Sequence, residues 1–348
     1  MFHKKTGSLP STINSSFDVL KFFLSLIVVT IHVNLTSQIL LPWSRIAVPL
    51  FFVISSYFLF SKINLTEKYD EQKLILKKYI FRNLKLYAFW FIALLPITLY
   101  YRKWFDAEIF VGFFKFVRDV LFQSTFRASW YIMATIIGTI IVFYLSKYLN
   151  AKLLMIVFFL IYLFCCATSN YEKIFYSVDI INNAMVLYKK LFGVPFNSFV
   201  VSLFWIFLGK VLSEKNLCFT RLQLIIGFIL SAILLEAEHL MIKFLDCAGT
   251  DDCYIFLAPI TVTIFLVVKQ SQMNLNQKVS VFLRKSSTII YASHASILVV
   301  VNAILNSFNI SINEILMFSI LFVACMTLSA LILWLEKYKY FRWLRYSH

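Results

Sequence analysis

Residues 17–35 read FDVLKFFLSLIVVTIHVNL, an apolar run interrupted by an acid, a base and an imidazole. The run is long enough to cross a bilayer as a helix, because a hydrocarbon core about 30 Å thick needs roughly 20 apolar residues. A helix also satisfies its own backbone hydrogen bonds, as a segment surrounded by lipid must. Charged side chains in such a segment are costly, so their presence indicates a bundle interior or a water-filled cavity.

The polar residues of this run share one face of the expected helix. At 100° per residue, Lys21 and His32 project about 20° apart and lie about 16 Å apart along the axis. Asp18 and Ser25 project within about 40° of His32. Lys21 can reach the membrane surface and Asp18 can cap the helix start, whereas His32 lies deeper. Two interpretations of His32 stay open: a core histidine bonded to a neighbouring helix, or a functional imidazole.

The whole chain has the composition of a membrane protein. Of its 348 residues, 61% are hydrophobic and only 14% are charged, and the mean hydropathy is +0.81, far above the values of soluble domains. No polar low-complexity stretch divides it, so we predict one membrane domain over residues 1–348. We expect a cytoplasmic lead at 1–16, a retained first span and a cytoplasmic tail at 336–348.

Ten segments approach the length of a membrane-spanning helix. Their apolar runs are continuous rather than alternating, which favours helices over barrel strands. The sequence therefore predicts an all-α, multi-pass bundle of about ten spans. The predicted spans are 17–38, 46–62, 84–101, 129–149, 152–169, 197–213, 219–242, 253–270, 285–306 and 312–335.

The distribution of positive charge predicts the orientation of these spans. With the N-terminus inside, 22 of the 33 Lys and Arg residues fall in inner segments and 10 in outer segments. Lys and Arg accumulate on the cytoplasmic side of membrane proteins. We therefore expect both termini in the cytoplasm, and we assign the net charge of +16 to inner loops facing anionic lipid rather than to nucleic-acid binding.

One outer segment has the pattern of a helix lying in the membrane interface. In residues 104–122, charged residues follow one helical stripe and Phe, Val and Ile occupy the other positions. Interfacial amphipathic helices have this division of faces. We predict such a helix here.

Two further polar groups lie near predicted outer ends. Cys247 and Cys253 flank a short loop, where an oxidising compartment would permit a disulfide, but spacing alone leaves the pairing open. Glu236, Glu238 and His239 cluster at a helix end. We interpret that cluster as a solvated helix end rather than a site.

Six blocks of the sequence together resemble the acyltransferase 3 family of integral membrane proteins. The blocks occur in the family's order and spread over nearly the whole chain. The resemblance implies transfer of an acyl group, commonly acetyl, from cytoplasmic acyl-CoA to a hydroxyl of a sugar or other envelope molecule, at a bacterial inner membrane. The blocks are DVLKFFLSLIVVTIH at 18–32, SRIAVPLFFVISSYFLF at 44–60, KKYIFRNLKLYAFW at 77–90, SWYIMATIIG at 129–138, LFWIFLGKVL at 203–212 and SSTIIYASHASI at 286–297.

The resemblance assigns roles to individual residues. The family's arginine and histidine separated by ten residues fall on Lys21 and His32, and its second basic pair falls on Arg82 and Lys85. Lys keeps the charge of Arg but loses its planar fork. The usual Gly of the second block is Ser56 here. The implied roles are catalysis by His32, binding of acyl-CoA by Lys21, Arg82 and Lys85, and contact with the acceptor or support of the site by Arg45, Tyr57, His294 and Trp130.

These residue types suit the implied chemistry. A sugar hydroxyl needs a base to take its proton, and a neutral imidazole near pH 7 is suited to that task. A covalent acyl-histidine is the alternative, and the sequence does not separate the two. The spacing of about 16 Å from Lys21 to His32 is close to the reach of an extended pantetheine arm.

The sequence leaves one rival function and several partners open. No paired-Cys zinc spacing occurs, so we expect no metal site. The expected partners are acyl-CoA, a glycan or glycolipid acceptor and the lipid bilayer, whereas the oligomeric state is open. The rival function is export or flipping of a polysaccharide or lipid-linked sugar, because buried polar groups also suit a transport pathway.

Overall fold

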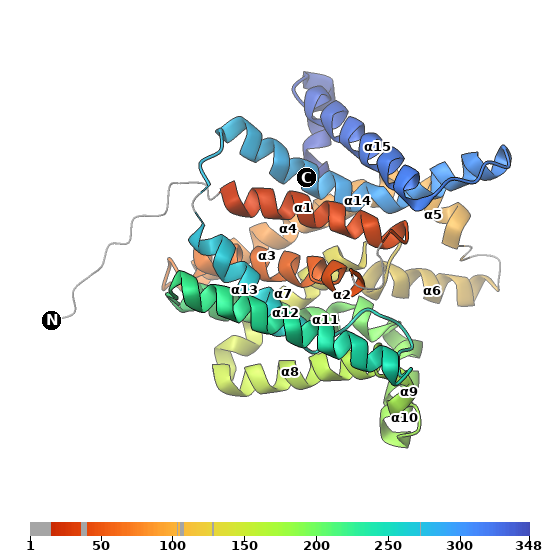
Figure 1. The fold of residues 1–348 in the computed structure, drawn as a ribbon. Coiled ribbons are helices and arrows are strands. Elements are labelled where there is room, and N and C mark those ends of the chain that lie inside the picture. The colour runs from red at the N-terminus through yellow and green to blue at the C-terminus, as the bar shows by residue number, and fades with distance from the viewer. Residues whose placement is uncertain (1–14, 36–39, 103, 105–107, 127–128, 272) are drawn as a thin grey trace.

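The computed structural model describes residues 15–35, 40–102, 104, 108–126, 129–271 and 273–348, and the predicted lead at 1–16 lies mostly outside them. The described residues form helices and no strand, which confirms the all-α class (Figure 1). The α-helices are α1 (Ser15–His32), α2 (Leu41–Ser44), α3 (Ala47–Ile63), α4 (Tyr69–Ala93), α5 (Leu95–Arg102), α6 (Ile109–Phe122), α7 (Trp130–Tyr148), α8 (Ala151–Ala167), α9 (Glu172–Phe175), α10 (Asp179–Phe192), α11 (Phe199–Glu214), α12 (Arg221–Phe244), α13 (Leu257–Gln270), α14 (Gln277–Ser307) and α15 (Glu314–Leu335). Two short 3₁₀ helices are η1 (Pro195–Asn197) and η2 (Lys339–Ser347).

The number of full-length spans in the described residues is smaller than predicted. Six helical stretches are long and apolar enough to cross a membrane: α1, α2 with α3, α7, α12, α14 and α15. A seventh is present if α10 and α11, bent by 43°, count as one span. Six or seven of the ten predicted spans are therefore helices long and apolar enough to cross a membrane, whereas the number of ten spans and the cytoplasmic location of the termini stay predictions.

Three of the remaining predicted spans differ from full-length helices for physical reasons. Helices α8 and α13 have 17 and 14 residues, which is short for a hydrocarbon core of about 30 Å. The predicted span 84–101 is divided between α4 and α5 at Leu94. Pro96 follows this break, and a proline is tolerated in the first turn of a helix but not in its interior. The first half of α4 is also rich in charge.

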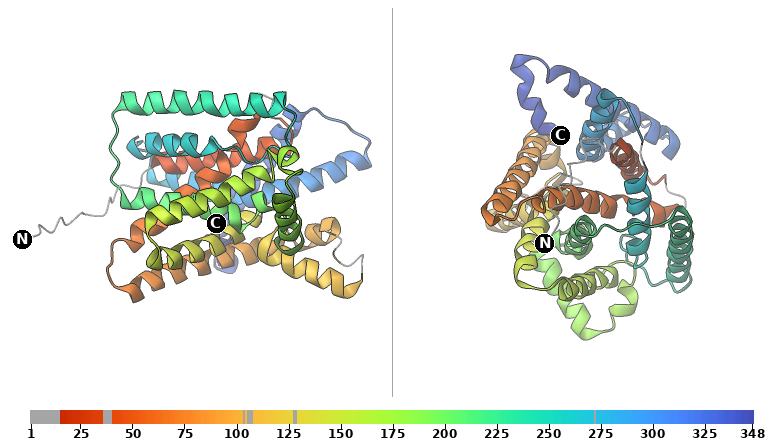
Figure 2. Two further views of the ribbon diagram at one scale, coloured as in Figure 1. Left: turned by 90° about the horizontal axis from the view of Figure 1, so that it is seen from below. Right: turned by 90° about the vertical axis from the view of Figure 1, so that its left-hand side faces the viewer.

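Helix α3 lies at the centre of the bundle. It contacts α1, α4, α7, α11 and α13, and the end-on view in Figure 2 shows it surrounded by other helices. Eleven of its seventeen residues are buried, as expected for a helix that is apolar on all sides. Through its position, α3 can contribute side chains to sites at both ends of the bundle.

The contact between α3 and α11 depends on Gly209. A Cβ atom at Gly209 would lie 2.0 Å from Ser56 Oγ and 2.5 Å from the Val53 carbonyl oxygen. Both distances are shorter than any ordinary contact, so only glycine lets the two backbones approach this closely. Ser56 turns its hydroxyl back to the Phe52 carbonyl at 2.7 Å.

Two peripheral segments match predicted regions. Helix α6 begins at Ile109 within the predicted 104–122, and residues 105–107 lie outside the described chain. Its aromatic side chains Phe110, Phe113 and Phe114 are exposed, and its position in a membrane interface stays a prediction. In the tail at 336–348, η2 folds back on α4, where Trp90 Nε1 donates to the Ser347 carbonyl at 2.9 Å.

Candidate active site

A cavity of about 950 Å³ opens at the end of the bundle where α1 begins and α3 ends. We call it the basic cavity. Its walls come from five helices, and six of its described lining residues are cations against one carboxylate. The cations are Lys21, Lys62, Lys78, Arg82, Lys269 and Arg284, and the carboxylate is Asp18. Such an excess of one charge in a concave site raises the local concentration of anions.

Asp18 connects two walls of the basic cavity. It is 5% exposed and accepts a hydrogen bond from Ser280 Oγ of α14 at 2.6 Å. Arg284 Nη1, one turn further along α14, lies 3.9 Å from the same carboxylate oxygen. This buried contact holds α1 against α14 and positions Arg284 at the cavity, so Asp18 does more than cap the helix start.

Tyr57 lies in the basic cavity and not beside Arg45. The two residues are twelve positions apart along α2 and α3, or about 18 Å at the rise of an α-helix, and each belongs to a different cavity. Lys269 Nζ lies 5.3 Å from the centre of the Tyr57 ring. Tyr57, for which the resemblance implies contact with the acceptor or support of the site, therefore lies among the cations of the basic cavity, and its role stays a prediction.

The predicted basic pair of α4 is separated in the structure. Arg82 lines the basic cavity, whereas Lys85 is absent from its described lining. Lys85 lies one turn further along, where η2 covers α4, and its Nζ is 5.1 Å from the centre of the Tyr346 ring. Lys78, four residues before Arg82, shares the face of Arg82 and takes the place expected for Lys85.

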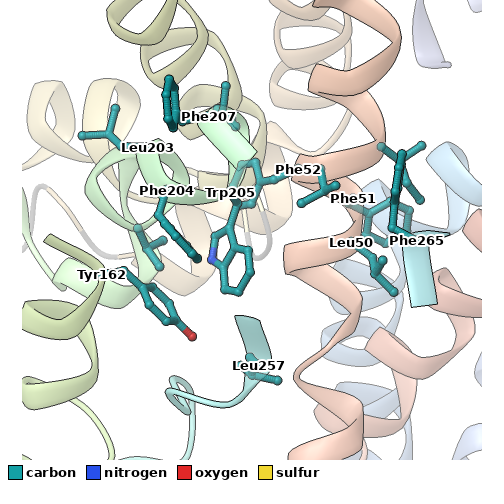
Figure 3. Packing of buried hydrophobic residues seen from close by; sticks show 14 of the residues in the cluster. Leu50, Phe51, Phe52, Tyr162, Leu203, Phe204, Trp205, Phe207, Leu257 and Phe265 are labelled. Carbon is teal, nitrogen blue, oxygen red and sulfur yellow. The ribbon is translucent and has the colours of Figure 1, made fainter. Parts of the chain in front are cut away.

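A second, smaller cavity of about 380 Å³ contains three of the predicted site residues: His32, Arg45 and Trp130. We call it the His32 cavity. Aromatic side chains form much of its wall, and Figure 3 shows Trp205 between Tyr162 and Phe52 there. Mostly apolar walls with a few fixed polar groups are typical of small-molecule sites.

His32 and His294, two of the predicted site residues, lie beside each other. Their ring centres are 4.9 Å apart. His294 is fully buried, and its Nδ1 lies 3.0 Å from the Ile290 carbonyl oxygen and 2.9 Å from the Tyr291 carbonyl oxygen. A carbonyl oxygen can only accept, so Nδ1 of His294 carries the proton. These bonds fix the orientation of the ring next to His32.

Arg45 is held by an acid that the sequence did not single out. Arg45 Nη1 lies 2.6 Å from Asp252 Oδ1, and both side chains, which line the His32 cavity, are about one-fifth exposed (20% and 22%). Asp252 belongs to the loop between α12 and α13. Sequence patterns within one helix cannot identify Asp252, because its partner Arg45 lies 207 residues away in the chain.

The loop that carries Asp252 is anchored by Glu238. This carboxylate is 3% exposed and accepts from the Ile255 and Phe256 amides at 2.6 and 2.8 Å and from Tyr171 Oη at 2.6 Å. Burial and the neighbouring Glu238 carboxylate raise the pKa of Tyr171, so this phenol stays a donor. The interpretation of this helix end as solvated was therefore wrong.

The thiols of the same loop are not joined. Cys247 and Cys253 are both free and buried, and Cys253 lines the His32 cavity. The amide of Cys253 donates to Asn170 Oδ1 at 2.9 Å, so hydrogen bonds and burial hold the loop without a disulfide. Across the described part of the chain, no group of three His, Cys, Asp or Glu residues could hold a metal ion.

The two cavities follow one another along the same two helices. On α1, Lys21 lines the basic cavity and Val28 and His32 line the His32 cavity. On α3, Phe52 lines the His32 cavity and Ser55, one turn further, lines the basic cavity. On both helices the basic cavity therefore lies next to the His32 cavity.

Comparisons with known proteins identify the family of the chain. The sequence profile of one family, described as an acyltransferase domain, matches residues 14–334. Two relatives from Enterococcus faecalis are each named amino-acid racemase. One is 26% identical over 93% of this chain and 46% of its own length, the other 23% identical over 70% and 34%. The chain thus spans less than half the length of these curated relatives, and no solved structure matches it.

Proposed function

Because the chain belongs to the acyltransferase 3 family, we propose that it is a multi-pass membrane O-acyltransferase of a bacterial inner membrane. Its donor is cytoplasmic acyl-CoA, with acetyl as the simplest acyl group. Its acceptor is a hydroxyl of a sugar in a cell-surface polysaccharide or a lipid-linked glycan. The observation that carries this proposal is the basic cavity followed, along α1 and α3, by the cavity that contains His32.

The basic cavity suits the donor. Coenzyme A carries several phosphate charges, and six cations against one carboxylate surround this cavity. Charge-assisted hydrogen bonds from Lys and Arg are the strong contacts for phosphate. Lys21 and Arg82 take the role that the resemblance gave them, and Lys78 replaces Lys85. The pantetheine arm then extends along α1 for about 16 Å to reach His32.

The His32 cavity suits the transfer step. The acceptor hydroxyl attacks the thioester carbonyl carbon while the imidazole of His32 takes its proton. The C–S bond breaks, and the imidazolium returns the proton to the leaving sulfur of coenzyme A. In the covalent variant, His32 itself attacks first and the acyl-histidine is then attacked by the hydroxyl. Arg45, Asp252 and Trp130 line the same cavity and face the acceptor.

The second candidate is export or flipping of the sugar substrate. Two cavities in line along α1 and α3 are also what a transport pathway would need. The two curated relatives, which carry an enzyme name of another class, leave this candidate open. It differs from the first in requiring no acyl-CoA.

The test uses purified protein in proteoliposomes. We expect transfer of radiolabelled acetyl from acetyl-CoA to an envelope glycan, and loss of transfer in His32→Ala with unchanged folding. Unchanged transfer in that variant would remove His32 from the mechanism. Movement of the glycan across the bilayer without transfer from any acyl-CoA would instead establish the exporter.

A further inference from the structure

A cluster of aromatic rings packs where α3 passes from the His32 cavity, lined by Phe52, to the basic cavity, lined by Ser55. Phe52 is 1% exposed, and its ring centre lies 4.5 Å from that of Tyr131 of α7. Tyr131 lies 5.3 Å from Tyr291 of α14, and Phe51 lies 5.7 Å from Tyr291. We call these four residues, Phe51, Phe52, Tyr131 and Tyr291, the aromatic partition.

The basic side of the partition is closed by a polar contact. Tyr79 and Ser55 both line the basic cavity, and their hydroxyl oxygens are 2.7 Å apart. Ser55 lies three residues from Phe52 on α3, or about 4.5 Å along the helix axis. The partition is therefore only about one helical turn thick on this side, and Phe52 forms its wall toward His32.

From this geometry we infer that the aromatic partition, with Phe52 as its main determinant, limits the transferred group to short acyl chains. The inference rests on the proposed function. The phosphates of the donor stay at the basic cavity, so the acyl group is the leading end. Its carbonyl must pass the partition to reach His32, and every carbon beyond the carbonyl then occupies the His32 cavity together with the acceptor.

The size and rigidity of the walls set the limit. The His32 cavity measures about 380 Å³, near the lower end of the range of ligand sites. Phe52 is held between Tyr131 and Trp130, at 4.5 and 6.1 Å between ring centres. Close-packed interiors accept extra methylene groups only with strain. A two-carbon acyl group adds one methyl beyond the carbonyl, whereas a longer chain must displace these rings.

The test measures transfer from acetyl-, butyryl- and octanoyl-CoA by the full chain in proteoliposomes. Wild type should transfer acetyl fastest and octanoyl least. Phe52→Leu should raise the ratio of butyryl to acetyl transfer by about tenfold, since one or two methylenes in an apolar pocket change discrimination by that order. Phe52→Met is a second variant, because Met keeps most of the volume and replaces a rigid ring by a flexible chain.

The matched control is Phe158→Leu. Phe158 of α8 is also 1% exposed and packs on Phe207, with ring centres 5.5 Å apart, but it lines neither cavity. This variant should keep the wild-type ratio. Wild-type transfer of octanoyl at the acetyl rate, or an unchanged ratio in both active Phe52 variants, would overturn the inference alone. Absence of transfer from every acyl-CoA by wild type would remove the proposed function and the inference with it.

Discussion

The basic cavity and the His32 cavity lie on the same two helices but are built in opposite ways. Several cations of the basic cavity, such as Lys62, Lys78 and Arg82, are exposed and come from α3 and α4. Long exposed cations can adapt to a large anionic ligand. In the His32 cavity, Asp252 is fixed by its hydrogen bond with Arg45. Beside His32, but outside the described lining, His294 is fixed by hydrogen bonds to backbone carbonyl oxygens.

This difference separates binding from chemistry along the bundle. Flexible charges suffice to hold phosphates, because attraction between charges tolerates small displacements. A reacting group needs a fixed orientation, since a displacement of about 1 Å can cost about a hundredfold in rate. We therefore expect substitutions in the basic cavity to change the affinity for the donor with little change in the rate of transfer. Substitutions in the His32 cavity should change the rate of transfer with little change in that affinity.

The largest expected effect is at His32. His32→Ala should reduce transfer by about a thousandfold, within the range for loss of a general base, while the Kd for coenzyme A stays within about twofold, because the residue lies about 16 Å from Lys21. The measurements are transfer rate and coenzyme A binding on the same preparation. Thr30→Ala is the control, since Thr30 lies on α1 outside the described linings of both cavities. A parallel loss of coenzyme A affinity in His32→Ala would contradict the separation.

The next effect concerns the loop that positions Asp252. Glu238→Ala leaves two backbone amides and the Tyr171 hydroxyl without their buried acceptor. We expect the free energy of unfolding to fall by about 3 kcal/mol, because unsatisfied buried groups cost about 1–3 kcal/mol each and part of the loss relaxes. Thermal unfolding in detergent measures it. Glu214→Gln, at the surface ion pair with Lys210, should change little, and equal effects of the two variants would refute the anchoring role.

A smaller loss of stability is expected where α3 meets α11. Gly209→Ala would place its Cβ 2.5 Å from the Val53 carbonyl, so the two helices must separate, at a cost of about 1–3 kcal/mol. Gly227→Ala is the control, because a Cβ there meets nothing closer than 3.7 Å and Ala is the better helix former. The midpoint of thermal unfolding should fall in Gly209→Ala only. Equal midpoints in the two variants would show that the α3–α11 contact can relax without cost.

The sequence was sufficient to predict the features that depend on one helix at a time. The shared face of Lys21 and His32 follows from the helical period, and the all-α class follows from continuous apolar runs. The sequence could not show which side chains of other helices meet that face, because this depends on packing between segments far apart in the chain. Lys269, Arg284 and Asp252 reach the cavities in this way.

The differences between sequence and structure have the same origin. Tyr57 and Arg45 match one sequence block, although they are twelve positions apart and line different cavities. Glu238 was interpreted as solvated because its depth in the bundle depends on the loop that folds over it. The count of ten spans was based on apolar length, which does not show where a helix breaks, as at Leu94.

The smallest expected effect shows which of Arg82 and Lys85 contributes to coenzyme A binding in the basic cavity. Arg82→Gln should weaken coenzyme A binding by about fivefold to tenfold, because it removes a charge that lines the cavity. The loss should shrink as salt concentration rises, since exposed charges are screened. Lys85→Gln should leave the affinity within about twofold, because Lys85 contacts Tyr346 instead. Lys77→Gln, beside the cavity residue Lys78 but outside the lining, controls for net charge. The contrary result is that Lys85→Gln weakens coenzyme A binding as much as Arg82→Gln does. That result would mean that the ligand extends past η2 and contacts both Arg82 and Lys85, as the sequence predicts, although Lys85 does not line the cavity.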